Sequence, residues 1–577
     1  MPQSVQEIQV SSVVQLLPVV YLKAGQLTCM YEHGKLRYLR SGHTEILRMI
    51  YIALRDSKWQ TLPYIISNEK IVKEANSFSI QYNATYYQKT TAVYKGSIAI
   101  TGKQDGTIQF SFSGEAIANF QRNRIGICVH HPIKECNGQK ATITKPDNSV
   151  YEASFPVAIN PHQPFTDVQQ MSWQTPDKHT VQLLFTGDIF ETEDQRNWSD
   201  SSFKTYSTPQ NPSFPLPVSL SPGDAIAQSV TCKVQAPLLP SPIAENNFYE
   251  EKIPFPSIGY CRQQNLAALH ADQINLFKKN PCGHYRVALA LKDENWKQVL
   301  AQASQEAIAL QTKLQLTLHF SEAYADELAA VLPTLIDHQL HIASILPLKQ
   351  SATFVPAAMQ SAIYNAIKEK LPMLPVGYGT DGNFVNLNRN RPALGYFDFV
   401  SFGLYPQAHS KDERSILENL DNQPDMVASA NAIAGGKPVF VSPITLHDRN
   451  GAAGADKRKH TSFGHWWLLM CIQQLGMADS ISLDAGNANN ANGNANGTNR
   501  NANDANGSAN DANQNANDTN GVNDYYQLLS AIQSFSPVWL VKRYKGDALL
   551  MDGLLLENKN GERLMIKPPA VLKEFRD

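Results

Sequence analysis

The densest group of residues able to do chemistry lies at positions 185–206, in the string FTGDIFETEDQRNWSDSSFKTY. The string begins like a β-strand, in which Glu191 and Glu193 would share one face roughly 7 Å apart and Asp194 would start the other face. Carboxylates beside a guanidinium, an amide and an ammonium suit a polar, hydroxylated substrate. The alternative is a solvated strand end followed by a salt-bridged turn, which charged runs commonly form. The candidate site residues of this string are Glu191, Glu193, Asp194, Arg196, Asn197 and Lys204.

A second group of candidate residues lies in the later half of the sequence. Asn388 and Arg389, in NLNRNRP, could bind a carbonyl or carboxylate group, because a guanidinium makes planar bidentate contacts. Tyr405 and His409 lie in FGLYPQAHSKD, where His409 could act as a general base, since the ordinary pKa of histidine is about 6.5. Structural roles remain open for both groups. His409 could be a surface residue that only forms hydrogen bonds, and the arginines of NLNRNRP could brace a loop against the barrel.

Composition excludes several classes of protein. The 577 residues have a formal net charge of −2 and 18% charged residues, which does not favour binding to nucleic acid or to an anionic membrane. No apolar run reaches about 18 residues, and the N-terminus has no basic segment before its apolar run, so we expect neither a membrane span nor a secretory signal. Seven cysteines without a CxxC spacing indicate reduced thiols and a cytoplasmic protein. We expect no metal and no cofactor.

The first third of the sequence predicts β structure. Short runs with a period of two, such as TTAVYKGSIAITGK and GTIQFSFSGEAIANF, are separated by turn signals that include Asp105-Gly106. Residues 43–62 could form a helix by apolar spacing, but their β-branched and aromatic side chains favour a strand. Adjacent histidines at 130 and 131 on a strand face opposite ways, which disfavours a metal site. We predict an N-terminal antiparallel β-sandwich at residues 1–245.

The middle of the sequence predicts a TIM-like (β/α)8 barrel at residues 246–536. Eight candidate strands, from SIGYCR to ADSISL, alternate with segments that have a helical period. The fifth connection, GTDGNFVNLNRNRPALG, shows no helical period, and we expect a polar loop that either holds a site or only caps the barrel. The barrel is followed by a small C-terminal β unit at residues 537–577. An Asn-rich insert at 487–524 interrupts the barrel, and its composition predicts disorder.

The ends of the predicted barrel strands place further polar residues at one edge of the barrel, among them His319, Lys349 and Asp381. A retaining glycosidase of the commonest barrel type needs one carboxylate after strand four and another after strand seven. Lys349 follows strand four here, and HDR at 447–449 follows strand seven, which argues against that chemistry. The absence of a GxSxG string likewise disfavours a serine-triad esterase.

Six colinear strings resemble the D-apionate lactonase family: GHTEILRMIYIALRDSKWQT, FQRNRIGICVHHP, EDQRNWSDSSFKTY, FVNLNRNRP, VSFGLYPQAHSKDE and VSPITL. The resemblance covers nearly the whole chain apart from the insert. It implies an N-terminal β domain, a TIM-like barrel and a small C-terminal β domain. It also implies hydrolysis of D-apionolactone to D-apionate in apiose breakdown, with Glu193, Asp194, Arg196, Asn197 and Lys204 as site residues. The chain departs from the family after its eighth strand, where ADSISLDAG runs into the Asn-rich insert.

The expected ligand is therefore a small sugar lactone, and a homo-oligomer is left open. We expect Glu193, coupled to Glu191, to act as the general base, and Arg196 or Lys204 to act as the donor to the oxyanion. We also expect Glu193 and Arg196 to face His409 and Arg389. A glycoside hydrolase and a catalytically silent carbohydrate-binding protein remain alternatives.

Overall fold

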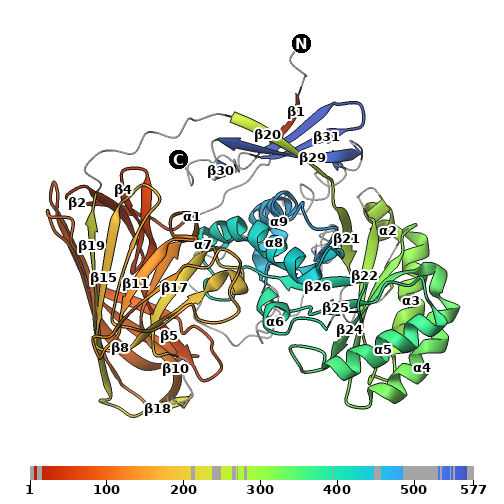
Figure 1. Ribbon diagram of the computed structural model, residues 1–577, viewed down its shortest axis with the longest axis horizontal. Helices are drawn as coiled ribbons and strands as arrows, with labels where there is room; N and C mark the ends of the chain where they lie inside the picture. The colour runs from red at the N-terminus through yellow and green to blue at the C-terminus, as the bar shows by residue number, and fades with distance from the viewer. Residues whose placement is uncertain are drawn as a thin grey trace, which may run out of the picture. The chain divides into compact units, whose positions relative to one another are not determined.

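The computed structural model describes residues 5–9, 16–209, 215–236, 248–262, 268–269, 271–278, 282–393, 395–447, 456–484, 531–532, 534, 536–545, 548–549 and 553–567. The chain divides into two compact units, one of residues Leu16–Ile243 and the other of Met1–Gln15 with Ala244–Asp577 (Figure 1). The Asn-rich segment 487–524, for which disorder is predicted, lies outside the described residues.

Two nine-stranded antiparallel sheets build the first unit. The first sheet has the order β13-β16-β17-β10-β5-β4-β3-β2, with β18 paired to β10. Its strands are β2 (Val20–Ala24), β3 (Leu27–Glu32), β4 (Lys35–Ser41), β5 (Thr44–Asp56), β10 (Phe120–Pro132), β13 (Phe165–Val168), β16 (Phe190–Asp194), β17 (Ser202–Ser207) and β18 (Val218–Leu220). The short helices α1 (Ile133–Cys136) and η1 (Gln195–Trp198) follow β10 and β16.

The second sheet has the order β12-β11-β14-β15-β19-β9-β8-β7-β6. Its strands are β6 (Tyr64–Lys73), β7 (Phe78–Gln88), β8 (Thr91–Gly102), β9 (Ile108–Ala116), β11 (Lys140–Thr144), β12 (Val150–Ser154), β14 (Gln170–Gln174), β15 (Thr180–Thr186) and β19 (Ala225–Gln235).

The two sheets pack face to face and enclose one apolar core, as the red-to-yellow part of Figure 1 shows. Alternate residues of β10, among them Ile125, Ile127 and Val129, point into this core, and Ile98 and Phe112 enter it from the second sheet. This confirms the predicted sandwich. It also confirms the strand at β5, where burial of β-branched side chains against a second sheet outweighs the helical spacing.

Eight parallel strands form the nearly closed barrel of the second unit, in the order β24-β23-β22-β21-β28-β27-β26-β25, and a single bridge from Ile345 to Val376 joins β24 to β25. The strands are β21 (Ser257–Cys261), β22 (His284–Ala290), β23 (Leu314–Phe320), β24 (Ile342–Lys349), β25 (Gly377–Gly379), β26 (Phe399–Leu404), β27 (Val439–Ile444) and β28 (Ser480–Leu483). The connecting helices are α2 (Ala271–Lys278), α3 (Trp296–Ala309), α4 (Tyr324–Asp337), η2 (Gln339–His341), α5 (Ala357–Lys370), α6 (Phe384–Arg389), α7 (Glu413–Glu418), η3 (Asn419–Asn422), α8 (Gln423–Ala434), η4 (Lys457–His460) and α9 (Ser462–Gln474). The predicted (β/α)8 barrel is confirmed.

The fifth connection differs from the prediction, because it contains the short helix α6. Phe384, Val385 and Leu387 bury the apolar side of this helix. A helix of six residues has fewer than two turns, which is too short for a 3.6-residue period to be recognised in the sequence.

A small sheet completes the second unit: β1 (Val5–Gln9), β32 (Arg563–Lys567), β31 (Leu554–Asn558), β29 (Pro537–Lys545) and β20 (Phe248–Pro254), with β30 (Ala548–Leu549) paired to β29. The strand β1 pairs in parallel with β32, the last described strand, so β1 belongs to this sheet and not to the sandwich predicted at residues 1–245. A pairing between the two ends of a chain leaves no local pattern to predict it from.

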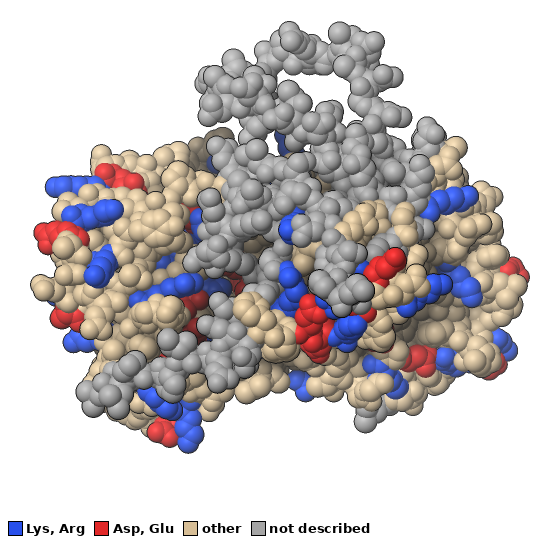
Figure 2. Space-filling model, turned by 90° about the horizontal axis from the view of Figure 1, so that it is seen from above, with Lys and Arg blue, Asp and Glu red and all other residues tan. Residues whose placement is uncertain are grey.

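The surface and the helices agree with the composition. On the face that Figure 2 shows, basic and acidic residues are interspersed, as a net charge of −2 suggests. Among the described residues, every helix is too short or too polar to span a membrane.

Candidate functional site

Four neighbouring strands of the first sheet (β16, β17, β10 and β5) align mostly polar residues in rows. One row consists of Glu193, Lys204, His130 and Met49, and the next of Glu191, Tyr206, Cys128 and Tyr51. Arg124 and Arg55 form a further pair on β10 and β5. Because side chains alternate across a strand, all of them point to the face opposite the sandwich core. We call these ten residues the strand-face cluster; all are buried.

The amide of Gln195 connects the carboxylate of Glu193 to the ammonium of Lys204. Glu193 Oε2 accepts a hydrogen bond of 2.6 Å from Gln195 Nε2, and Lys204 Nζ donates one of 2.6 Å to Gln195 Oε1. The other oxygen, Glu193 Oε1, accepts from Trp198 Nε1 at 3.1 Å. In the neighbouring row, the Tyr206 hydroxyl donates to Glu191 Oε1 at 2.7 Å. A carboxylate and an amine are thus held two hydrogen bonds apart.

Burial changes the protonation of this cluster. Burial, together with the positive charges of Arg55 and Arg124, lowers the pKa of Lys204 to about 7. Burial also lowers the pKa of His130 well below its ordinary value, so its ring is neutral at pH 7. Nδ1 of this ring lies 3.0 Å from Ser202 Oγ. Lys204 therefore exchanges its proton near neutral pH, which is typical of groups in catalytic sites.

The expected site residues Asp194, Arg196 and Asn197 hold a loop in place. Arg196 makes a bidentate ion pair with Asp194, at 2.9 Å from Nε to Oδ1 and 2.8 Å from Nη2 to Oδ2, and neither side chain is exposed. The same guanidinium donates to the carbonyl oxygens of Pro156 and Val157. The Asp194 carboxylate caps η1, and the Asn197 amide donates to the carbonyl oxygen of residue 160. These contacts are structural, and contact of the three residues with a substrate stays a prediction.

The candidate residues of the barrel lie on two connections. Asn388 is buried on α6, and its Oδ1 accepts a hydrogen bond of 3.1 Å from Arg391 Nη2. This contact is expected of an arginine that braces a loop. Arg389 is exposed at the end of α6. Tyr405 is buried directly after β26, and His409 is partly exposed before α7. The expected approach of Glu193 and Arg196 to His409 and Arg389 involves both units and stays a prediction.

Three charged or titratable residues meet at the carboxyl ends of the barrel strands. Arg286 on β22 and His319 on β23 converge on Asp381, which follows β25. Arg286 Nη2 and His319 Nε2 each lie 3.6 Å from Asp381 Oδ2. We call Arg286, His319 and Asp381 the barrel-mouth cluster. Sequence reasoning named the strand-end positions of His319 and Asp381 but missed Arg286, although an arginine inside the apolar strand YRVALAL is itself a signal.

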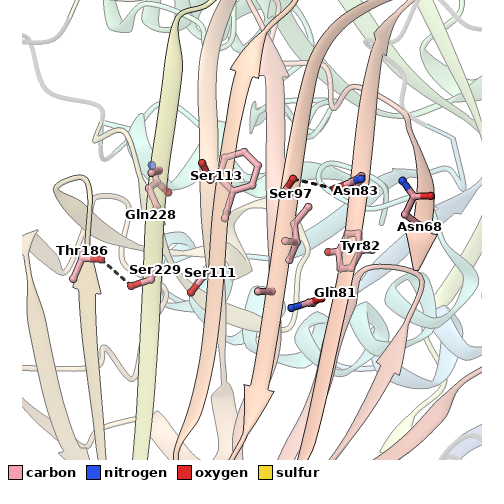
Figure 3. Close-up of a pocket in the computed structure, with 14 residues that line it drawn as sticks. Asn68, Gln81, Tyr82, Asn83, Ser97, Ser111, Ser113, Thr186, Gln228 and Ser229 are labelled. Atoms are coloured by element: carbon pink, nitrogen blue, oxygen red, sulfur yellow. Dashed lines mark hydrogen bonds between the residues drawn. The ribbon is translucent and has the colours of Figure 1, made fainter. Parts of the chain in front are cut away.

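A hollow of about 740 Å³ lies elsewhere, on the exposed face of the second sheet (Figure 3). Its floor presents short polar side chains, with hydrogen bonds from Ser97 Oγ to Asn83 Oδ1 and between Thr186 Oγ1 and Ser229 Oγ. No acidic or basic residue lines it, so it supplies neither a base nor a cation. Within the described ranges, no three His, Cys, Asp or Glu residues are grouped as metal ligands.

Comparisons with known proteins identify the family. Residues 11–237 match the model of the D-apionate lactonase N-terminal domain, and residues 258–517 match that of the D-apionate lactonase TIM barrel domain. The D-apionate lactonase of Brucella anthropi is 27% identical over 458 residues, which are 75% of this chain and 74% of that protein.

Solved structures are more distant. A β-arabinopyranosidase aligns over 93% of this chain and 90% of its own, at 11% identity and a TM-score of 0.31. The family 51 α-L-arabinofuranosidase AbfB of Bifidobacterium longum aligns over 42% of this chain and 68% of its own, at 10% identity and a TM-score of 0.30. Similarities this low do not indicate function.

Proposed function

The chain belongs to the D-apionate lactonase family, and we propose that it opens D-apionolactone to D-apionate in the breakdown of apiose, with the strand-face cluster as its catalytic centre. The observation that carries the proposal is the bridge through Gln195. It holds the Glu193 carboxylate and the Lys204 ammonium at fixed positions on one face of the sheet.

Hydrolysis of a lactone needs a water molecule, a base and donors to the developing oxyanion. Glu193 takes a proton from water as the water oxygen bonds to the carbonyl carbon. Lys204, in its charged form, donates a hydrogen bond to the carbonyl oxygen as that oxygen becomes negative. The ring C–O bond then breaks, the protonated Glu193 returns its proton to the departing oxygen, and the product is a hydroxy acid that ionises in water. A base typically contributes about 10²–10⁴-fold and an oxyanion donor about 10²–10³-fold.

The contacts of the other residues support this assignment of roles. Asp194 and Arg196 are bound to each other and to backbone groups, which leaves Glu193 and Lys204 as the better base and donor. Glu191 lies one row away and accepts a hydrogen bond from the Tyr206 hydroxyl, which leaves Glu193 as the carboxylate beside Lys204.

An assay with purified full-length protein tests the reaction class. Acid release from D-apionolactone and from D-ribono-1,4-lactone is followed beside release of nitrophenol from aryl glycosides, and spontaneous lactone hydrolysis is subtracted. The proposal expects turnover of lactones, with D-apionolactone preferred, and no turnover of glycosides. Turnover of glycosides alone would establish a glycoside hydrolase. Turnover of neither class would refute hydrolysis and favour a carbohydrate-binding protein.

A further inference from the structure

The barrel-mouth cluster lies where functional sites of parallel barrels form. Arg286 comes from within β22, His319 from the end of β23, and Asp381 from the loop after β25. The carboxyl ends of parallel strands meet at one rim, and loops there are free to carry polar groups without disturbing the core. The three residues therefore approach one point from two strands and from the loop that follows a third.

The Asp381 loop is held rigidly against the neighbouring strand β26. Thr380 N donates to the Ser401 carbonyl at 3.0 Å, and Gly403 N donates to the Gly382 carbonyl at 2.7 Å. A Cβ atom at Gly403 would lie 2.3 Å from the Asp381 carbonyl oxygen, so this approach requires glycine on β26. The backbone that carries the Asp381 carboxylate is thus held in place before any ligand arrives, which lowers the entropy lost on binding.

A layer of uncharged polar side chains lies inside the barrel, on β22, β23, β27 and β28. His284 Nε2 lies 2.8 Å from Ser482 Oγ, which also accepts from Ser442 Oγ at 2.8 Å, and Gln315 Nε2 donates to Ser480 Oγ at 3.2 Å. Burial lowers the pKa of His284 to about 3, so its ring is neutral. His284 precedes Arg286 by two residues on the same face of β22, so a ligand of Arg286 enters from the mouth.

Exposure and charge indicate the kind of ligand. The Arg286 side chain is 5% exposed, whereas those of His319 and Asp381 are each 22% exposed, so the cluster opens outward from a buried cation. The guanidinium and the carboxylate cancel in charge, which favours a neutral ligand over an anion. The two 3.6 Å separations exceed the roughly 2.8 Å of a charge-assisted hydrogen bond, so neither Arg286 nor His319 donates a short hydrogen bond to Asp381 Oδ2.

We propose that the barrel-mouth cluster is a binding site for the vicinal hydroxyl groups of a neutral sugar ring. Asp381 accepts hydrogen bonds from the ligand hydroxyls, and Arg286 and His319 donate to the hydroxyl oxygens. The site belongs to the barrel unit alone, and its existence does not depend on hydrolysis by Glu193.

The test uses 1,4-anhydroerythritol, an inert five-membered ring with a cis diol, as the probe of full-length protein, and tetrahydrofuran as the control ring without hydroxyls. Ligand-observed NMR titration should show binding of the diol and none of tetrahydrofuran. Asp381→Asn should raise the dissociation constant at least tenfold, whereas the control Asp337→Asn, at the exposed end of α4, should leave it unchanged. His319→Gln, at a partly exposed position, provides a second variant if Asp381→Asn does not fold.

Three results would overturn the proposal. The first is diol binding that persists in folded Asp381→Asn and His319→Gln proteins. The second is binding that is lost in Glu193→Gln but kept in Asp381→Asn, which would locate the diol in the strand-face cluster. The third is D-ribonate binding more tightly than the diol and depending on Arg286, which would make this an anion site. Because the probe has no bond to hydrolyse, none of these results depends on the lactonase activity.

Discussion

Glu193 on β16 and Lys204 on β17 are cross-strand partners, and the side chain of Gln195 forms a hydrogen bond with each of them. In an antiparallel pair of strands such as this one, the Cβ atoms of opposite residues lie about 4.5–5.5 Å apart. The amide of Gln195 therefore sets the relative positions of a base and a cation that the backbone has already brought together.

Replacing Glu193 by Gln should reduce kcat/KM by about 10²–10⁴-fold, the usual contribution of a general base. Stability should change little, because glutamine keeps an acceptor oxygen for one of the two donors, Gln195 Nε2 or Trp198 Nε1. Steady-state kinetics on D-apionolactone and a melting curve measure the two effects. Glu152→Gln, at an exposed position of β12, is the matched control and should behave as the wild type. Full turnover by a folded Glu193→Gln protein would show that the cluster organises the fold and not the chemistry.

Lys204 should produce a falling limb in the pH–rate profile near pH 7. Its pKa is lowered to about 7, and the charged form that donates to the oxyanion is lost as the pH rises through that value. Lys204→Arg keeps its charge and should move the limb to higher pH, whereas Lys204→Met should be slower at every pH and should lack the limb. A limb near pH 7 that persists in Lys204→Met would assign it to another group.

The same lysine should make stability depend on pH in the opposite direction. Its pKa is lower in the folded chain than the 10.5 of an ordinary lysine, so the unfolded chain binds more protons between about pH 7 and 10.5. The free energy of unfolding of the wild type should therefore rise with pH across this window relative to that of Lys204→Met. Chemical denaturation at pH 7 and pH 9.5 measures the difference, and equal changes in the two proteins would contradict the assignment.

Breaking the ion pair between Asp194 and Arg196 should destabilise the sandwich. Arg196→Met leaves the Asp194 carboxylate buried and removes the donors to the carbonyl oxygens of Pro156 and Val157. Removing one member of a buried pair typically costs about 3–5 kcal/mol. Denaturant titration of the full chain measures this loss. Lys95→Met removes an exposed ion pair with Glu115 and, as the control, should change stability by less than about 1 kcal/mol. If Arg196→Met lost as little stability as Lys95→Met, the ion pair between Asp194 and Arg196 would have no structural role.

Deleting residues 487–524 should leave the melting temperature nearly unchanged. The segment is almost wholly Asn, Ala, Gly and Asp, and loop-closure entropy varies only slowly with loop length. Differential scanning calorimetry of the deleted and intact chains makes the comparison. A fall of many degrees would show that the segment packs against the protein.

The sequence alone determined the architecture of both units and the position of one stretch dense in charged residues. Alternation with a period of two and strand–helix repeats are local patterns, so the sandwich, the eight barrel strands and the C-terminal strands could be predicted from them. The two carboxylates on one face of β16 followed from the same period, since Glu191 and Glu193 are two residues apart.

Tertiary structure alone decided which residues surround those carboxylates. His130 on β10 and Tyr51 on β5 join the rows of Glu193 and Glu191 through the register of strands far apart in the chain. Arg286 likewise reaches Asp381 only because the barrel curves their strands toward a common mouth. β1 pairs with β32 from the opposite end of the chain. Register and closure depend on which buried faces pack together over long sequence separations, and a local pattern of side chains contains no record of that packing.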